Sequence, residues 1–249
     1  MKRVAALYDI HGNLPALEAV LREVREVDAE LLLVGGDVFP GPMAHECLTL
    51  LGSLAIPTEF ICGNGDRAVL DALRGIHDGT LPEAARTAVR WNADGLDEDD
   101  ALQLARWPVT RRVDIDGLEA VRFCHATPRN DTDVFTQRTA DEQLRPIFAG
   151  VDEALVVCGH THMQFDRVVG PTRVVNAGSV GMPFGQAGAY WLLLGPGVEL
   201  RRTSYDRNQA AERIRATSYP HAAEFALRNV LQPQSVSDML DLFGRVEVK

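Results

Sequence analysis

The stretch RVAALYDIHGNLPALEAVLREV, residues 3–24, sets the pattern on which the rest of the chain is built. It begins with a short apolar run of the kind that forms a buried strand. It ends with apolar residues at helical spacing, and Pro15 stands in the first turn, where a helix tolerates proline. The turn between the two parts holds Asp9 and His11. The stretch therefore predicts a buried strand followed by an amphipathic helix.

The same pattern recurs twice along the chain. ELLLVGGD (30–37) and TEFICGNGD (58–66) are apolar runs that end in polar turns, and a helical pattern over 43–54 lies between them. Near-continuous apolar strands that alternate with helices predict a parallel sheet covered on both faces. Ligands of such sheets collect beyond the carboxyl ends of the strands. The polar turns at these ends are therefore the first place to look for a site.

The second half of the chain favours antiparallel pairs. VTRRVDIDGLEAVRFCH (109–125) reads as two strands around an Asp116-Gly117 turn, and 165–179 and 189–205 are further hairpins with Gly-Pro turns. ALVVCGHTH (154–162) is another buried strand, and a helical pattern covers 140–149. These strands predict a second sheet packed against the first.

Two segments read as helical rather than as part of the sheets. One covers about 66–107 and interrupts the strands, and the other covers about 207–244. Internal repeats and low-complexity linkers are absent from the sequence, so we expect a single domain over 1–249. The 66–107 insertion is suited either to shaping a substrate cleft or to a dimer contact, and the sequence leaves the oligomeric state open.

Composition narrows the classes of partner. The formal net charge of −10 disfavours broad binding to nucleic acid, which needs clustered cations. The sequence contains no run of 18 apolar residues and its start lacks the features of a signal peptide, so we expect a cytoplasmic protein that does not span a membrane. Its four cysteines are widely spaced and are interpreted as buried, reduced thiols.

Polar side chains of one chemical kind follow the predicted strands. Carboxylates, imidazoles and an amide are ligands for divalent first-row metals, and residues two apart in an extended segment point the same way. Taken singly, each is usually a turn residue or a structural histidine. Together they provide more ligands than one ion needs, and their number suits two ions that share a carboxylate. The set comprises Asp9, His11, Asp37, Asn64, His125, His160 and His162.

The series DIH, GGD, GNGD, H and GHTH resembles the signature of the calcineurin-like metallophosphoesterases. The motifs run from residue 9 to residue 162, and NAGSVGMP at 176–183 is similar to a segment of the small prokaryotic members. The resemblance implies an α/β fold, a four-layer α/β/β/α sandwich of two mixed sheets flanked by helices. It also implies that Asp37 bridges two ions, with Asp9, His11 and His162 on one and Asn64, His125 and His160 on the other.

The resemblance further implies a reaction. Family members bind manganese, iron, zinc, nickel or cobalt, and manganese is a common activator in the prokaryotic group. We expect a dinuclear phosphoesterase that hydrolyses phosphodiester or nucleotide phosphoanhydride bonds of a small phosphorylated substrate by a metal-activated water. The alternatives are a dinucleoside polyphosphate hydrolase, a phosphomonoesterase and, ranked lower, a non-catalytic metal-bound interaction module.

Gly65 is the main departure from the family pattern. Many relatives have a histidine there, which is thought to protonate the leaving group. A glycine therefore disfavours activity toward poor leaving groups, unless water, His11 or His45 substitutes for the missing acid. A histidine introduced at 65 would restore the acid only if the turn accepts a β-carbon. Asp66 is interpreted as a residue that orients a ligand.

Three residues are weaker candidates for binding substrate. Arg67 follows the GNGD motif and Arg129 lies four residues after His125, so either could donate to phosphate oxygens or simply be a surface arginine. Asn13 could contact substrate or cap the first helix. Glycines flank the predicted ligands, which suits both tight turns and close approach to the ions.

Overall fold

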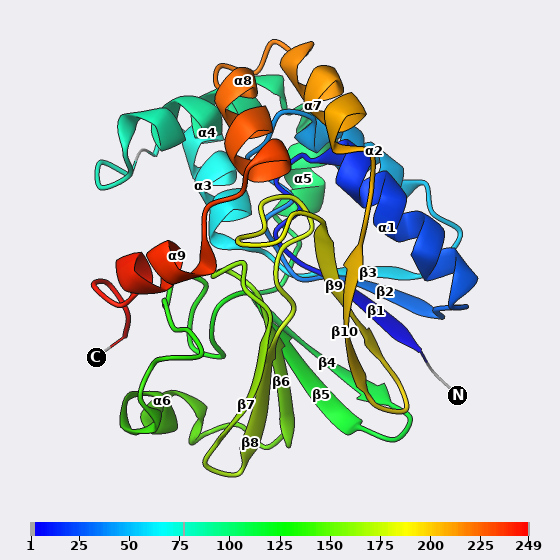
Figure 1. Ribbon diagram of the computed structural model, residues 1–249, viewed down its shortest axis with the longest axis vertical. Helices are drawn as coiled ribbons and strands as arrows, with labels where there is room; N and C mark the ends of the chain where they lie inside the picture. Colours follow the sequence, from blue (N-terminus) through cyan, green and yellow to red (C-terminus); the bar gives the residue numbers. More distant parts are fainter. Residues whose placement is uncertain (1–2, 77, 249) are drawn as a thin grey trace.

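The computed structural model describes residues 3–76 and 78–248 and contains two five-stranded sheets (Figure 1). The strands of the first sheet lie in the order β10-β9-β1-β2-β3. Strands β1, β2 and β3 are parallel, and the hairpin of β9 and β10 adds two antiparallel strands beside β1. Their bounds are Val4–Leu7 (β1), Leu31–Val34 (β2), Thr58–Phe60 (β3), Ala189–Leu194 (β9) and Val198–Thr203 (β10).

The second sheet has the order β4-β5-β6-β8-β7. Here β5, β6 and β8 are parallel, whereas β4 and β7 pair antiparallel at the two edges. The three predicted hairpins are confirmed as β4–β5, β7–β8 and β9–β10. The bounds are Thr110–Ile115 (β4), Glu119–Cys124 (β5), Leu155–Cys158 (β6), Phe165–Val169 (β7) and Thr172–Asn176 (β8).

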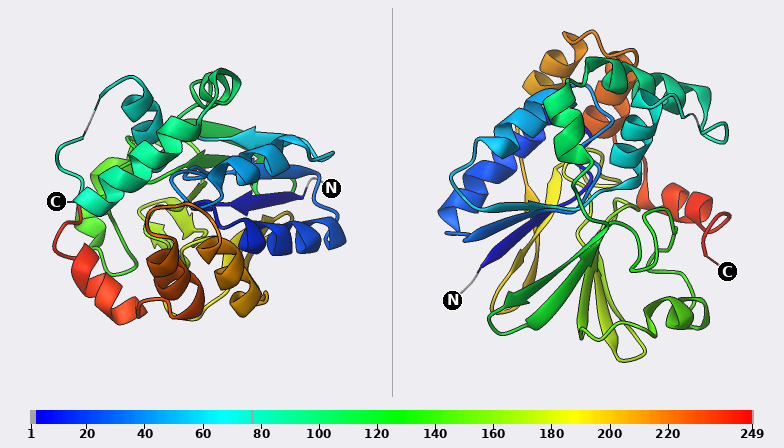
Figure 2. Two further views of the ribbon diagram at one scale, coloured as in Figure 1. Left: turned by 90° about the horizontal axis from the view of Figure 1, so that it is seen from above. Right: turned by 180° about the vertical axis from the view of Figure 1, so that it is seen from behind.

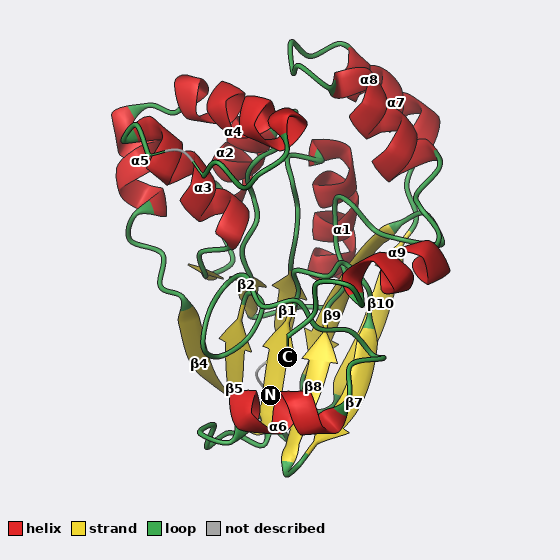
Figure 3. Cartoon of the chain, turned by 90° about the vertical axis from the view of Figure 1, so that its left-hand side faces the viewer, coloured by secondary structure: helices red, strands yellow, loops and turns green. Residues whose placement is uncertain are grey.

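The helices lie mainly beyond one end of the strands and on the outer faces of the sheets (Figures 1 and 3). The predicted insertion holds α3 (Asn64–Leu73), α4 (Glu83–Gly95) and α5 (Glu98–Leu104), and the division of the chain into one domain stays a prediction. The others are α1 (Leu14–Glu26), α2 (Ala44–Gly52), α6 (Asp141–Phe148), α7 (Arg207–Arg215), α8 (Ala222–Phe225), the π-helical segment η1 (Ala226–Leu231) and α9 (Val236–Phe243).

Alternation along β1 explains why the sheets stack. Val4, Ala6 and Tyr8 pack between the two sheets, whereas Ala5 and Leu7 pack under the helices that cover the first sheet. Successive side chains of a strand point to opposite faces, so a strand that is apolar throughout is buried on both sides. A further apolar cluster joins the second sheet to α6, which lies outside that sheet (Figure 2). The four-layer sandwich is therefore confirmed.

The four cysteines are free thiols, as expected, and Cys47, Cys124 and Cys158 are buried, whereas Cys62 is only partly buried. Within the described part of the chain, no helix has both the length and the apolar character needed to cross a membrane.

We predict that Tyr8 joins the sheets through its hydroxyl. Tyr8 is completely buried, and its hydroxyl donates a 3.1 Å hydrogen bond to the Val157 carbonyl on β6. Tyr8→Phe should lower the free energy of unfolding by about 0.5–1.5 kcal/mol in a urea titration. Tyr190→Phe is the control, because its hydroxyl also bonds a backbone carbonyl but is partly exposed. Equal losses in the two variants would contradict the special role of Tyr8.

Candidate metal centre

The seven predicted ligands all follow strands and meet at the seam between the sheets. Four of them come from the first sheet, because Asp9 and His11 follow β1, Asp37 follows β2, and Asn64 follows β3 and begins α3. The other three come from the second sheet and are His125 after β5 and the pair His160 and His162 after β6. Contacts of 4.0 Å or less connect all seven side chains.

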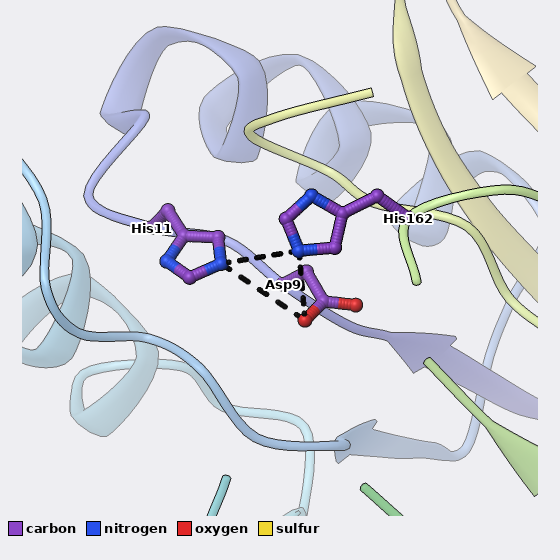
Figure 4. A group of neighbouring side chains, drawn as sticks. All are labelled: Asp9, His11 and His162. Atoms are coloured by element: carbon purple, nitrogen blue, oxygen red, sulfur yellow. Dashed lines mark hydrogen bonds and ion pairs between the residues drawn. The ribbon is translucent and has the colours of Figure 1, made fainter. Parts of the chain in front are cut away.

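Asp9, His11 and His162 form one compact group, in which the three side chains point toward one another (Figure 4). Asp9 Oδ1 lies 3.4 Å from His162 Nε2 and 4.0 Å from His11 Nε2. It is buried and accepts no hydrogen bond from any described residue, whereas Oδ2 of the same carboxylate accepts one from the His160 amide. A buried carboxylate oxygen without a donor is costly, and a cation at this point would remove that cost.

Asp37 lies between this group and the remaining ligands. Its Oδ2 is 3.6 Å from His11 Nε2 and 3.5 Å from His125 Nε2. Its Oδ1 accepts a 2.7 Å hydrogen bond from the Gly65 amide, which fixes the orientation of the carboxylate. One oxygen of Asp37 is therefore turned toward both halves of the centre.

Backbone carbonyls fix the tautomers of three histidines. Nδ1 lies within hydrogen-bond distance of the Pro40 carbonyl in His11, of the Gly35 carbonyl in His125 and of the Met182 carbonyl in His162. A carbonyl only accepts, so each Nδ1 carries the proton. Each Nε2 then presents a lone pair to the centre when the ring is neutral, which is the form that binds a metal.

Asn64 and His160 complete the set. One terminal atom of the Asn64 amide lies 2.9 Å from His160 Nδ1 and 3.0 Å from His125 Nε2. If that atom is nitrogen, it donates to the two histidines; if it is oxygen, it accepts from protonated His125 or, with neutral rings, can bind a cation together with them. The donor types and the unpartnered Asp9 oxygen together fit divalent first-row metals.

The backbone is strained at five of the seven ligands. Asp9, His11, Asp37, His160 and His162 have φ between 45° and 67°. This left-handed region disfavours residues with a β-carbon, and such strain clusters at functional sites because the surroundings hold it in place. The described part of the chain contains only two other non-glycine residues with positive φ, so the strain is concentrated at the centre.

The charges of the centre balance in part without any ion. Burial raises the pKa of Asp9, but His162 and His125 outweigh it and lower the value overall. Burial also raises the pKa of Asp37, and His125 likewise reverses the shift. Burial lowers the pKa of His125, but the adjacent Asp37 dominates and raises it to about 10. Burial lowers the pKa of His160 to about 4.

Asp66 supports the centre from behind, in the manner interpreted from the sequence. It is completely buried, and it accepts hydrogen bonds from the backbone amides of Asp37, Phe39 and Gly63 at 2.7–3.0 Å. Burial and the nearby Asp37 raise the pKa of Asp66 to about 7, against the three amides that lower it. The side chain thus ties the turn after β2 to the turn after β3.

The segment 176–183 holds the centre from the other side, and sequence reasoning gave it no residue roles. Ser179 Oγ donates to the Asp9 carbonyl at 2.7 Å, and the Met182 carbonyl pairs with His162 Nδ1 at 2.8 Å. Asn176 donates to the Gly159 carbonyl beside His160. The resemblance at NAGSVGMP is the only sequence signal for these residues, because none of them belongs to the seven predicted ligands.

Gly65 has no room for a side chain. A β-carbon at this position would lie 2.4 Å from the Phe39 carbonyl oxygen and 3.0 Å from Asp37 Oδ1. The condition under which a histidine could supply an acid here is therefore not met, because the backbone after β2 occupies the space. His45, the other residue considered as a substitute acid, points its Nδ1 toward Asp100 at 3.4 Å.

The three weaker candidates for substrate binding already have partners. Asn13 is completely buried, caps α1 through the Ala16 amide and donates to the Gly181 carbonyl, which favours the capping alternative. Arg67 makes a bidentate pair with Asp131 and lines a pocket beside the centre. Arg129 pairs in the same way with Asp133 and is half-exposed. A role in binding substrate stays a prediction for all three residues.

Comparisons with known proteins agree with this architecture. The model of the calcineurin-like phosphoesterase superfamily domain matches residues 2–195. The uncharacterized protein MJ0912 of Methanocaldococcus jannaschii is 24% identical over 233 residues, which cover 85% of this chain and 91% of that protein.

Two crystal structures share the fold. The hypothetical protein PH1004 from Pyrococcus horikoshii matches with a TM-score of 0.78 and 20% identity, over 94% of this chain and 100% of the other. A metallophosphoesterase from Sphaerobacter thermophilus matches with a TM-score of 0.71 and 24% identity, over 93% and 99% of the two chains. These likenesses show a common fold.

We predict that glycine relieves strain at His160 but not at His125. In the metal-free protein, His160→Gly should be more stable than His160→Ala by about 1 kcal/mol, because only glycine adopts positive φ at little cost. His125 lacks positive φ, so there the alanine variant should be the more stable by about 0.4–1 kcal/mol. Urea titrations of the four variants measure both differences. The same order at both positions would contradict the strain argument.

Proposed function

Because this chain belongs to the calcineurin-like phosphoesterase superfamily, we propose that it is a dinuclear metal-dependent phosphoesterase. In this proposal it hydrolyses phosphodiester or nucleotide phosphoanhydride bonds of a small substrate in the cytoplasm, with manganese as the first metal to test. The seven side chains at the seam are its proposed ligands, with Asp37 as the bridge.

One observation carries the proposal. Asp37 Oδ2 lies almost equally far from His11 Nε2 and His125 Nε2, at 3.6 and 3.5 Å, and these nitrogens belong to the two halves of the ligand set. Two ions held in these halves would be close enough to share the carboxylate, as in two-metal hydrolases, where the ions are roughly 3.5–4 Å apart. The unpartnered Asp9 oxygen adds a second point at which positive charge is needed.

The residues of this chain would contribute to the reaction by holding the ions and by shielding the centre from water. The histidines and carboxylates would fix the positions of the ions, and the carbonyls behind the rings would prevent them from turning. When bound, the ions would supply positive charge that polarises the phosphoryl group and lowers the pKa of the attacking water. The buried position of the centre would strengthen these electrostatic effects, because the local dielectric constant is low.

An enzyme accounts for the geometry better than a metal-bound interaction module does. A pocket of about 430 Å³ opens beside the centre, and His11, Asp37 and Asn64 are among its lining residues. A pocket of this size that reaches three proposed ligands suits a small substrate. An interaction module would not require such access to the ligands.

We predict that cleavage depends steeply on the leaving group. Metal-loaded protein should hydrolyse bis-p-nitrophenyl phosphate with Mn²⁺ and lose that activity on removal of the metal. Across substrates graded by leaving-group pKa, aryl diesters and phosphoanhydrides should react well and alkyl monoesters poorly. A general acid raises the rate roughly 10²–10⁴-fold when the leaving group is basic, and Gly65 cannot supply one.

The slope of rate against leaving-group pKa is the measurement. A flat dependence would mean that another group protonates the leaving oxygen, and absence of any Mn²⁺-dependent turnover would refute the proposed activity.

We predict that Asp37→Asn removes metal and activity but leaves the fold intact. The amide oxygen of Asn can still accept from the Gly65 amide, yet the charge shared by the two halves is lost. Turnover should fall by at least about 10²-fold, with loss of at least one ion per chain. Elemental analysis and circular dichroism measure metal content and folding. Asp166→Asn, which makes the same charge change at the pair with Arg173, is the control; a metal-replete, active Asp37→Asn protein would refute the bridge.

A further inference from the structure

The pocket beside the centre runs away from the ligands between α3 and α4. Its first part is lined by His11, Asp37 and Asn64, and its walls continue along both helices and the segment that connects them. Asn64 begins α3 and Ala72 lies eight residues later on the same helix, which corresponds to about 12 Å at 1.5 Å per residue. A substrate whose phosphoryl group lies at the centre therefore has space for an organic group along α3.

The apolar part of the pocket lining is aliphatic. Small and branched side chains line it, namely Ala68 and Ala72 of α3, Ala85 and Val89 of α4, and Leu81 between the helices, whereas Ile76 is 57% exposed and lies toward the mouth. Ala72 and Ala85 are small, so the space between the helices is not filled by the chain itself. Apolar walls of this kind favour an apolar occupant by the area that it removes from water.

The polar side chains along the pocket are largely engaged. Arg67 pairs with Asp131, and Arg86 donates to the Leu81 carbonyl. Asp78 accepts from the amide and hydroxyl of Thr80. Arg90 lines the pocket as well, but it is exposed and so belongs to the mouth rather than to the wall. Asp71 of α3 also lines the pocket, and its carboxylate lies 3.8 Å from the Arg67 guanidinium. Most polar side chains of the walls therefore already have a partner.

The lining also lacks a platform for a nucleobase. The described residues that form the pocket include no phenylalanine, tyrosine or tryptophan. Proteins that recognise unpaired bases usually stack them on aromatic rings or on free arginine guanidinium planes and read their edges with free donors and acceptors. Among the described lining residues, Arg67 and Arg86 are already engaged by Asp131 and the Leu81 carbonyl, so the chemistry of these walls favours an aliphatic group over a base.

We propose that the α3–α4 pocket binds the organic group that stays on the phosphorus, not the leaving group, and selects phosphodiesters in which this retained group is an aliphatic chain. This inference rests on the proposed function, because it places the phosphoryl group at the metal centre. Ala72 and Ala85 determine specificity, since a larger side chain at either position would fill the space that the aliphatic group of the substrate occupies.

Calorimetric titration of the manganese-loaded protein with methyl-, butyl-, hexyl- and octylphosphonate tests this without turnover. Affinity should rise about three- to fourfold per methylene until the pocket is full, because each buried methylene contributes a constant increment of binding free energy. Ala85→Leu should abolish most of this rise, and Ala72→Leu on the opposite wall should do the same. Ala84→Leu is the matched control, because Ala84 is the exposed neighbour on α4 and does not line the pocket.

Each outcome decides the question. The proposal is supported if affinity rises with the length of the alkyl group in the wild type and in Ala84→Leu but not in the two pocket variants. A flat series in the wild type, or a rise that persists in both pocket variants, overturns it. Adenosine monophosphate that binds more tightly than octylphosphonate and is weakened by both pocket variants also overturns it, in favour of a nucleoside. If affinity rises with alkyl length but bis-p-nitrophenyl phosphate is not hydrolysed, the proposal for the pocket stands and the proposed activity is refuted.

Discussion

Two carboxylates buried at the seam of two sheets form the constraint on which the rest of this structure depends. Asp9 and Asp37 are almost completely inaccessible to water, and both are held ionised by the histidines around them. Isolated buried charges are too costly to persist, so positive charge must lie beside them. Imidazoles alone can supply it as protons, and metal ions can supply it more strongly. The groups around the carboxylates all serve to keep that location fixed.

Holding these groups together has a cost in backbone strain. Each of the five ligands in the left-handed region costs about 1–3 kcal/mol of conformational energy. Two kinds of interaction offset this strain: the packing of the apolar layers on both sides of the first sheet, and the hydrogen bonds that Asp66 and Ser179 make to the turns. The rigidity of the sheets thus determines the ligand geometry, because a mobile scaffold would relax the turns.

Much of the fold follows from the sequence because its signals are local. Apolar runs that end in polar turns indicate the parallel strands, and Asp-Gly or Gly-Pro turns indicate the hairpins. The ligands could be predicted because they follow strands whose carboxyl ends meet. The left-handed backbone at Asp37 and the crowding at Gly65 could not be predicted, since both depend on how separate turns pack against each other. A substrate cleft at the 66–107 insertion was one of the two alternatives that the sequence suggested, but the lining of the pocket could not be predicted, because it depends on the spacing of α3 and α4.

The walls of that pocket come from a single stretch of chain. Apart from the residues next to the centre, nearly all of the lining lies between residues 67 and 90, in the segment that connects β3 to β4. All seven proposed ligands lie outside residues 67–90, and Asn64 stands just before this stretch. Evolution can therefore lengthen, shorten or exchange this one segment and alter what the protein accepts, while the sheets and the chemistry at their seam are inherited unchanged.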